Sequence, residues 1–337
     1  MKLAMRKLGI PLLGLVLLAG CAELSQMENP LKHLTAPPAS RVYVANAGSD
    51  SVTVIDALNA KTLATMESKN PAPHGLALSR DGSRLYATSP AAGRLAVIDT
   101  RTLETIASIY TGSRCHGVAL TPDDRFAWVA NTGENTVALI DTATLRIVGN
   151  IATGKGPVDL AFSRDGAFAY IALQVDKSIA VVDTATLRVI KTILVGANPH
   201  FLVLGPDGRI WGANSGGNDI YVIDPATQSK VAGIEVGANP QQIAFAYKGM
   251  IGPNAYVTLS GANQIAVVSA QPINQLRLLE RIQVGERPNG IAANTDGTRI
   301  FVGHETANDL RIYDTGTNTM IATTPVGRKP IRVVLSR

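Results

Sequence analysis

Short runs of alternating or β-branched apolar residues recur along the chain, and turn-forming residues separate them. Between residues 158 and 194 four such runs follow one another: VDLAFS, FAYIAL, SIAVVD and LRVIKTIL. The turn sequences RDG (164–166) and DTAT (183–186) lie between them. Alternation with a period of two residues is typical of β-strands, and no repeating unit contains ten residues with the 3.6-residue period of a helix. The pattern predicts an all-β protein with many short strands.

One nine-residue phrase appears twice, as IDTATLRIV at 140–148 and as VDTATLRVI at 182–190. Its aspartate recurs every 41 to 45 residues, at Asp56, Asp99, Asp141, Asp183, Asp224 and Asp314, with Ser269 in the remaining place. A period in the low forties with four strands per unit is typical of propeller blades. We therefore predict a seven-bladed β-propeller with four-stranded antiparallel blades. The aspartate should accept backbone hydrogen bonds in the turn between the third and fourth strands.

The two ends of the repeating region complement each other. The first unit begins at its second strand, RVYVAN (41–46), and the chain ends on an innermost strand, PIRVVLS (330–336). Pairing these two fragments in one blade would close the ring and remove an open sheet edge. We predict that the C-terminal strand is the innermost strand of the N-terminal blade.

The repeats resemble the YVTN repeats of bacterial and archaeal propellers. The matching segments are YVAN (43–46), WVAN (128–131), YVT (256–258) and the recurring VIDTAT. The resemblance covers residues 41–337 and implies the propeller fold, but such motifs are structural and say little about function. The sixth unit departs from it, with YKGMIGPN (247–254) and SAQPINQLRLLER (269–281) in place of the usual turns. We expect an irregular edge there that a partner could contact.

The N-terminus has the pattern of a targeting segment. Three positive charges are followed by the apolar run LGIPLLGLVLLA (8–19), which is too short to span a bilayer. The sequence LAGC (18–21) resembles the bacterial lipobox, in which the cysteine is acylated and becomes the first mature residue. We predict a lipoprotein signal peptide at 1–20, a lipidated Cys21 with a flexible tether over 21–40, and a propeller over 41–337. In the lipoproteins that this segment resembles, Asp after the cysteine favours the inner membrane, so Ala22 implies an outer-membrane lipoprotein facing the periplasm.

Composition and charge narrow the range of partners. The chain is 46% hydrophobic, 17% charged and 5% aromatic, which suits a globular protein. Its formal charge of +5 falls to +2 when the three positive charges of residues 1–20 are removed. A charge this small predicts no strong affinity for polyanions, and the few aromatic residues argue against stacking on nucleic-acid bases. We expect a monomer that is held at the membrane by its lipid anchor.

Histidines supply the main chemical signal. His74, His116 and His200 occupy one equivalent position, at the start of an innermost strand beside the channel, and Cys115 precedes His116. His304 ends a second strand, where other units have Asn46, Asn131 and Asn214. Such imidazoles, with the Cys115 thiol as a soft second ligand, could bind a transition metal or a haem-like ring, and protonation would then weaken ligation below about pH 6.

The alternative reading of these residues is structural. The histidines belong to different blades, which predicts that most pairs lie too far apart to share one metal, and each imidazole could simply hydrogen-bond the next blade. Cys115 could be a small buried residue that fills the space of a proline ring. We favour this structural reading at the level of sequence.

Basic residues gather in the loops that lead into the innermost strands. They are Arg114, Lys155, Arg287, Arg328 and Lys329, with Arg332 just beyond. The neighbouring loops between second and third strands are acidic, so a positive ring should lie inside a negative rim. This ring would attract an anionic ligand. Ordinary solvated loops that carry charges of both signs would give the same sequence pattern.

Three functions remain open. The first is a lipid-anchored module that binds a protein partner or a small anionic ligand through the variable loops at the channel mouth, because variable loops on a rigid scaffold are where binding sites are built. The second is a metal-, haem- or tetrapyrrole-binding propeller that uses the histidines. The third is a lactonase-like hydrolase, since lactonases also use seven-bladed propellers. No acid–base pair with a diagnostic spacing is evident, so we favour a binding role over an enzymatic one.

Overall fold

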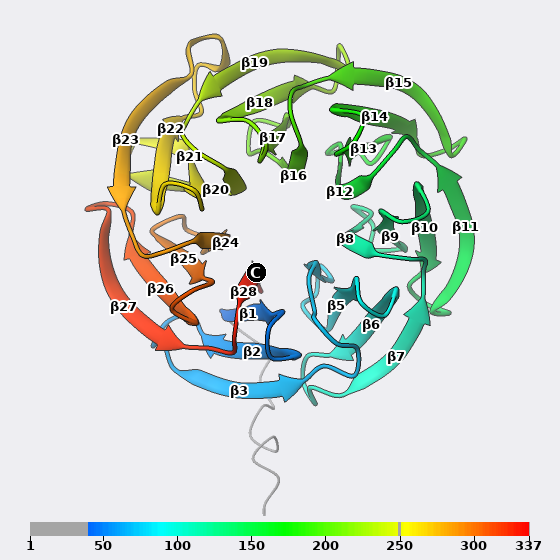
Figure 1. Cartoon of the computed structure of the whole chain (residues 1–337), viewed down its shortest axis with the longest axis horizontal. Coiled ribbons are helices and arrows are strands. Elements are labelled where there is room, and N and C mark those ends of the chain that lie inside the picture. Colours follow the sequence, from blue (N-terminus) through cyan, green and yellow to red (C-terminus); the bar gives the residue numbers. More distant parts are fainter. Residues whose placement is uncertain (1–39, 249–250, 337) are drawn as a thin grey trace, which may run out of the picture.

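The computed structural model describes residues 40–248 and 251–336, and these form seven four-stranded antiparallel sheets around a common axis (Figure 1). The predicted all-β, seven-bladed propeller is therefore confirmed. The predicted signal peptide at 1–20, the lipidated Cys21 and nearly all of the tether lie outside the described residues. None of the helices in the described part of the chain has the length and apolar character needed to cross a membrane.

The strands group into blades that we number along the chain, each given from the axis outward. The first four are blade 1, β28 (Pro330–Leu335), β1 (Arg41–Asn46), β2 (Ser51–Asp56) and β3 (Thr62–Glu67); blade 2, β4 (Leu76–Leu78), β5 (Arg84–Ser89), β6 (Arg94–Asp99) and β7 (Thr105–Tyr110); blade 3, β8 (Cys115–Leu120), β9 (Phe126–Asn131), β10 (Thr136–Asp141) and β11 (Arg146–Ala152); and blade 4, β12 (Pro157–Phe162), β13 (Phe168–Leu173), β14 (Ser178–Asp183) and β15 (Arg188–Leu194). The last three are blade 5, β16 (Pro199–Leu204), β17 (Ile210–Asn214), β18 (Asp219–Asp224) and β19 (Ser229–Glu235); blade 6, β20 (Pro240–Lys248), β21 (Ile251–Leu259), β22 (Gln264–Ser269) and β23 (Arg277–Gln283); and blade 7, β24 (Pro288–Ala293), β25 (Arg299–His304), β26 (Asp309–Asp314) and β27 (Thr319–Pro325).

Apolar packing between neighbouring blades holds the ring together. Each pair of adjacent blades shares one hydrophobic cluster, including the pair formed by blades 7 and 1. Strand β1 shows why its residues are apolar on both faces: Val42 and Val44 face blade 7, whereas Tyr43 and Ala45 face blade 2. The outermost strands are different. β15, for example, is mostly exposed.

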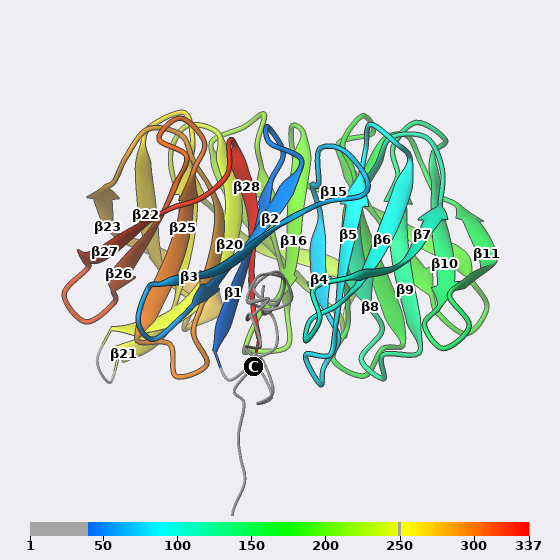
Figure 2. The same cartoon turned by 90° about the horizontal axis from the view of Figure 1, so that it is seen from below.

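The C-terminal strand closes the ring as predicted. β28 pairs antiparallel with β1, with Val44 opposite Val333 and Val42 opposite Leu335. The pairing continues past the strand, because Arg41 and Ser336 exchange two hydrogen bonds of 2.8 Å. β1 begins and β28 ends at the same end of the ring, and the innermost strands begin at the opposite end (Figure 2).

The repeated aspartates fill the predicted structural role. Asp141 Oδ1 accepts hydrogen bonds from the backbone N–H groups of Ala143 and Thr144, at 3.1 and 2.7 Å. The same side-chain-to-backbone bond follows Asp56, Asp99, Asp183, Asp224 and Asp314. The duplicated phrase therefore spans the end of a third strand, its turn and the start of a fourth strand.

Blade 6 is irregular where the sequence departs from the repeat. β20 and β21 have nine residues each, longer than the five to seven of most other strands. A single turn of 3-10 helix, η2 (Ile273–Gln275), replaces the turn that an aspartate would have organised. A groove of about 190 Å³ lies between this segment and residues 231–233 of β19.

Candidate functional site at the mouth of the channel

One loop geometry recurs before every innermost strand. In each blade the residue two positions before the channel-facing one adopts a left-handed backbone conformation, with φ between 49° and 71°: Ala72, Arg114, Gly156, Asn198, Asn239, Arg287 and Lys329. Proline follows in every blade except blade 3, where Cys115 takes its place. In blades 3 to 7 the pairing of the innermost strand with its neighbour then shifts register. Such irregularities redirect side chains, and here the side chains point to the axis.

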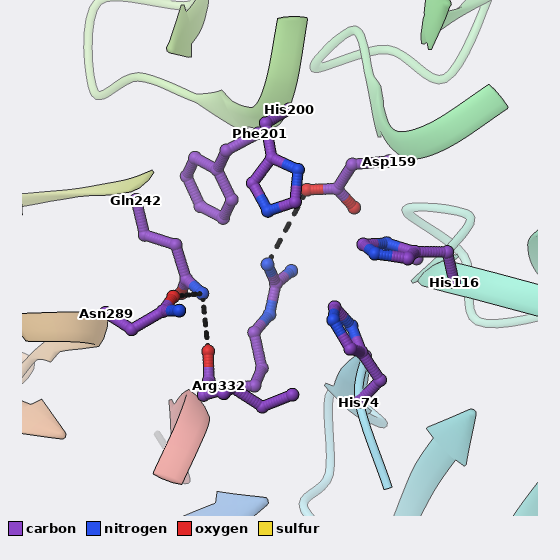
Figure 3. A pocket seen from close by; sticks show the side chains of 11 residues that line it. His74, His116, Asp159, His200, Phe201, Gln242, Asn289 and Arg332 are labelled. Atoms are coloured by element: carbon purple, nitrogen blue, oxygen red, sulfur yellow. Dashed lines mark hydrogen bonds and ion pairs between the residues drawn. The ribbon is translucent and has the colours of Figure 1, made fainter. Parts of the chain in front are cut away.

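Three of the predicted histidines meet there. The ring centroids of His74 and His116 are 3.8 Å apart, and those of His116 and His200 are 5.5 Å apart (Figure 3). With Asp159 and Arg332 they line a cavity of about 20 Å³, enough for the centre of roughly one water-sized molecule. The sequence predicted that most pairs of histidines lie too far apart to share one metal. The pairs of His116 with His74 and with His200 are exceptions in that their rings lie close together. Innermost strands converge on the axis, so equivalent positions on different blades become neighbours.

Hydrogen bonding fixes the proton on one of these rings. His116 Nδ1 lies 2.9 Å from the carbonyl oxygen of Val158 in the next blade. A carbonyl only accepts, so Nδ1 carries the proton and the lone pair of a neutral His116 is on Nε2. The prediction that an imidazole hydrogen-bonds the next blade is therefore confirmed for His116 Nδ1. The Nε2 atom of His116 takes no part in this hydrogen bond. His200 Nδ1 is buried and has no hydrogen-bond partner within the described part of the chain.

Burial keeps all three imidazoles neutral. It is the main cause that lowers the pKa of His116 to about 3 and that of His200 to about 4, with Arg332 adding to both shifts. Burial, followed by the neighbouring His116 and His200, also holds the pKa of His74 well below its usual value. Protonation is therefore expected only near pH 4 or below, which corrects the threshold of about pH 6 inferred from the reference pKa.

An ion pair crosses the cavity that the three histidines line. Arg332 Nη1, from the closing strand of blade 1, lies 3.5 Å from Asp159 Oδ2 of blade 4. The guanidinium also lies over the ring of Phe201, 4.9 Å from its centroid. Burial raises the pKa of Asp159, and Arg332 opposes that shift. Gly117 permits this arrangement, because a Cβ atom there would lie 2.4 Å from Asp159 Oδ1.

Asp159, Phe201 and Gln242 were not predicted as site residues. Each follows the position that His74, His116 and His200 occupy in their own blades, and the repeat register alone could have indicated them. Gln242 connects blades at the axis, since its Nε2 donates to Asn289 Oδ1 at 3.3 Å and to the Ile331 carbonyl at 2.8 Å.

Two predicted ligands lie away from this pocket. Cys115 is fully buried in the cluster between blades 2 and 3, and its thiol donates to the carbonyl oxygens of Ser89 and Arg94 at 3.2 and 3.3 Å. Burial raises the pKa of this thiol. His304 is also fully buried, with Nδ1 3.3 Å from Asp309 Oδ1, and burial lowers its pKa to about 4. Among the described residues no group of three or more His, Cys, Asp or Glu side chains is arranged to hold a metal ion.

The predicted cationic ring is split between the surface and the pocket. Arg114, Lys155, Arg287, Arg328 and Lys329 are exposed on the leading loops, whereas Arg332 lines the cavity. One of the exposed members is paired, since Arg287 Nη2 lies 3.5 Å from Glu305 Oε2.

Comparison with known proteins gives the chain a family. Its fold is similar to that of hydrazine synthase from Kuenenia stuttgartiensis (TM-score 0.67, 18% identity, 79% of this chain and 90% of that one). It is also similar to the dihydro-heme d1 dehydrogenase NirN in complex with DHE (TM-score 0.65, 17% identity, 89% and 76%) and to a 6-phosphogluconolactonase candidate from Bacteroides fragilis (TM-score 0.74, 13% identity, 88% and 98%). No curated protein matches the sequence. Residues 41–329 match the model of the cytochrome D1 heme domain, which is not the YVTN-repeat family that the motifs resemble, and the chain belongs to this heme-domain family.

Proposed function

We propose that this protein binds a tetrapyrrole at the mouth of its channel. The observation that carries the proposal is the convergence of three neutral imidazoles, from blades 2, 3 and 5, on one pocket in a chain of the cytochrome D1 heme domain family. A neutral imidazole is the form that ligates a metal, and burial keeps His116 and His200 in that form at any physiological pH.

The dimensions of the pocket restrict how such a group fits. A cavity of about 20 Å³ cannot hold a macrocycle, so the ring would have to lie outside it, over the mouth. His116 is the best candidate for a ligating residue, because its Nδ1–H is held by the Val158 carbonyl and its Nε2 lone pair is not. A haem-like group, when bound, would supply a metal that this nitrogen could ligate.

The exposed cations suit the same ligand. Tetrapyrroles of the haem type carry carboxylate side chains, and Arg114, Lys155, Arg328 and Lys329 lie exposed on the loops around the mouth. Positive charges around a cleft raise the local concentration of an anion and speed its association, an effect that salt weakens. We expect the rate of tetrapyrrole binding to fall with ionic strength.

A titration with haemin tests the proposal. Untagged wild-type protein should bind haemin with a shift of the Soret band. The substitution His116→Ala should weaken binding by at least about tenfold, the size of loss common when even an outer partner of a metal ligand is removed. His304→Asn is the matched control: it removes another buried histidine but introduces the residue that blades 1, 3 and 5 have at this position.

Two outcomes would contradict tetrapyrrole binding through His116. One is a wild-type protein that leaves the Soret band unshifted at all haemin concentrations. The other is a His116→Ala variant that binds as well as the His304→Asn variant. Turnover of a sugar lactone that is lost in His116→Ala, without haemin binding in the wild type, would favour the lactonase-like alternative.

We also propose that the protein is a lipid-anchored component of the bacterial cell envelope, held through Cys21 with the propeller in the periplasm. The lipobox-like sequence LAGC and the residue Ala22 support this proposal. In cells fed a labelled fatty acid, wild-type protein should incorporate label and Cys21→Ala should not, because the acylated thiol is missing. A Cys115→Ala variant is the control and should label like wild type. Label that persists in Cys21→Ala would refute the anchor.

A further inference from the structure

Arg332 has few charge partners for a cation that is largely buried. Its side chain is 17% exposed, and among the described residues its one ion-pair partner is Asp159, at 3.5 Å through a single nitrogen–oxygen contact. A guanidinium has five N–H donors in a planar fork that matches both oxygens of a carboxylate at once. The contact with Asp159 uses little of that capacity.

Asp159 is equally incompletely satisfied. Its side chain is 3% exposed, and its Oδ2 accepts from the Leu202 N–H at 3.3 Å in addition to the contact with Arg332. Its Oδ1 is buried and has no hydrogen-bond partner among the residues that the structure describes. A buried carboxylate oxygen without a donor is costly, so this half of the pair is a poor match for the negatively charged form.

Both side chains line the axial cavity, which is of limited size. A cavity of about 20 Å³ admits a small terminal group but excludes any ring. The other polar side chains of the wall are those of His74, His116 and His200, whose rings carry no charge, and of the neutral Gln242 and Asn289 (Figure 3). Arg332 is therefore the one positive group of the cavity wall among the described residues.

We propose that Arg332 recognises a carboxylate group of the ligand and that Asp159 is its internal competitor. In the free protein Asp159 occupies the guanidinium. On binding, the ligand carboxylate replaces Asp159 on Arg332, and Asp159 takes up one proton from solvent. We take this carboxylate to be on a side chain of the tetrapyrrole, so the inference rests on the proposed function. It adds Arg332 and Asp159 to that function as a pair that determines ligand specificity.

Charge balance explains why Asp159 would take up a proton when the ligand carboxylate binds. Two carboxylates beside one guanidinium would leave a net negative charge in a buried site, which protonation of Asp159 removes. Glu305 accepts a hydrogen bond from Asn289 Nδ2 at 2.6 Å and is paired with Arg287, so it brings no positive charge to the cavity. The cations Arg114 and Lys329 lie on exposed loops, and β20 and β24 contribute only Gln242 and Asn289 to the cavity wall. Burial already raises the pKa of Asp159. The pKa values of His116 and His200, about 3 and about 4, keep these rings out of the titration between pH 5 and 8.

The experiment compares a metal-free tetrapyrrole dicarboxylic acid, protoporphyrin, with its dimethyl ester. Wild-type protein should bind the free acid at least about tenfold more tightly than the ester, because a charge-assisted bidentate contact is lost in the ester. Asp159→Asn keeps the shape and frees Arg332, so it should bind the acid more tightly than wild type at pH 7.5. In wild type the affinity for the acid should fall with rising pH, by up to about tenfold per unit, and in Asp159→Asn it should not.

Removing the cation requires a variant that leaves no unpaired charge in the site. Asp159→Asn combined with Arg332→Gln removes both partners and should lose most of the wild-type preference for the acid. Arg188→Gln, which removes an exposed cation from the outermost strand β15, is the matched control and should keep the preference for the acid. Each variant is first checked for cooperative thermal unfolding.

The outcomes separate this inference from the proposed function. Equal binding of acid and ester by wild type, or weaker binding of the acid by Asp159→Asn, would overturn the role of the pair while leaving tetrapyrrole binding intact. If neither compound binds, the proposed function fails. Acetate then tests whether the cavity still binds a carboxylate. A thermal shift by acetate in Asp159→Asn that is absent from the double variant would sustain a carboxylate subsite, and no shift in either would refute it.

Discussion

Deletion of residues 330–337 is expected to lower the free energy of unfolding by several kcal/mol. The deletion removes β28 and leaves β1 without the strand that pairs with residues 42–46. It also removes Val333, which is 3% exposed in the cluster between blades 7 and 1. Loss of this strand should cost on the order of two large-to-small core substitutions, about 4 kcal/mol or more. Thermal or urea unfolding of the truncated and full-length proteins measures the effect.

A substitution on an outermost strand is the control for the truncation. Ile321 in β27 is 47% exposed, and Ile321→Ala should change the free energy of unfolding by less than about 0.5 kcal/mol. A truncated protein that unfolds at the same temperature as the full-length chain would contradict closure of the ring by β28. The truncation also removes Ile331 and Arg332 from the pocket wall, so tetrapyrrole binding should be lost together with the stability.

Acidification is expected to destabilise the protein well above the range in which carboxylates titrate. In the unfolded chain a histidine takes up a proton near its ordinary pKa of 6.5, whereas in the folded protein burial lowers the pKa of His116 to about 3 and that of His200 to about 4. The unfolded state therefore binds more protons as the pH falls below about 6.5, and stability decreases with it. Between pH 7.5 and pH 5 these two histidines should together cost about 4 kcal/mol.

The pH window identifies the cause of this loss. Turn carboxylates such as Asp141 and Asp183 have a pKa lowered by hydrogen bonds from Thr144 and Thr186, so their contribution is present above the unfolded pKa and fades mainly below pH 5. A variant with both His116→Gln and His200→Gln should lose about 4 kcal/mol less than wild type between pH 7.5 and 5. The loss that remains comes from His74 and His304, whose pKa values burial also lowers. A wild-type protein equally stable at both pH values would show that these imidazoles are protonated or exposed in solution.

Ring closure and the proposed ligand recognition depend on the same strand. β28 provides the innermost strand of blade 1 and, through Arg332, the cation that crosses the axis to Asp159. A ligand that binds Arg332 in the folded protein and not in the unfolded chain adds its binding free energy to the stability of the closed ring. Ring closure and ligand recognition are therefore linked through the last residues of the chain.

The sequence by itself determined the architecture. Strand alternation, turn aspartates and a period in the low forties are local signals, and each acts within one blade. Even closure was readable, because the missing innermost strand at residue 41 and the unpaired strand at 330 are complementary fragments of one repeat. The shared position of His74, His116 and His200 was also visible in the repeat register.

Only the tertiary structure decided which of the seven equivalent positions meet and in what chemical state. Distances across the axis depend on how all blades pack, so the contact of His74 with His116 and the pairing of Arg332 with Asp159 have no local signal. Backbone direction decides whether a side chain reaches the cavity, and it turns Cys115 into the core although its neighbour His116 faces the axis. Burial, which no single repeat can specify, makes these imidazoles neutral and leaves Asp159 partly unsatisfied.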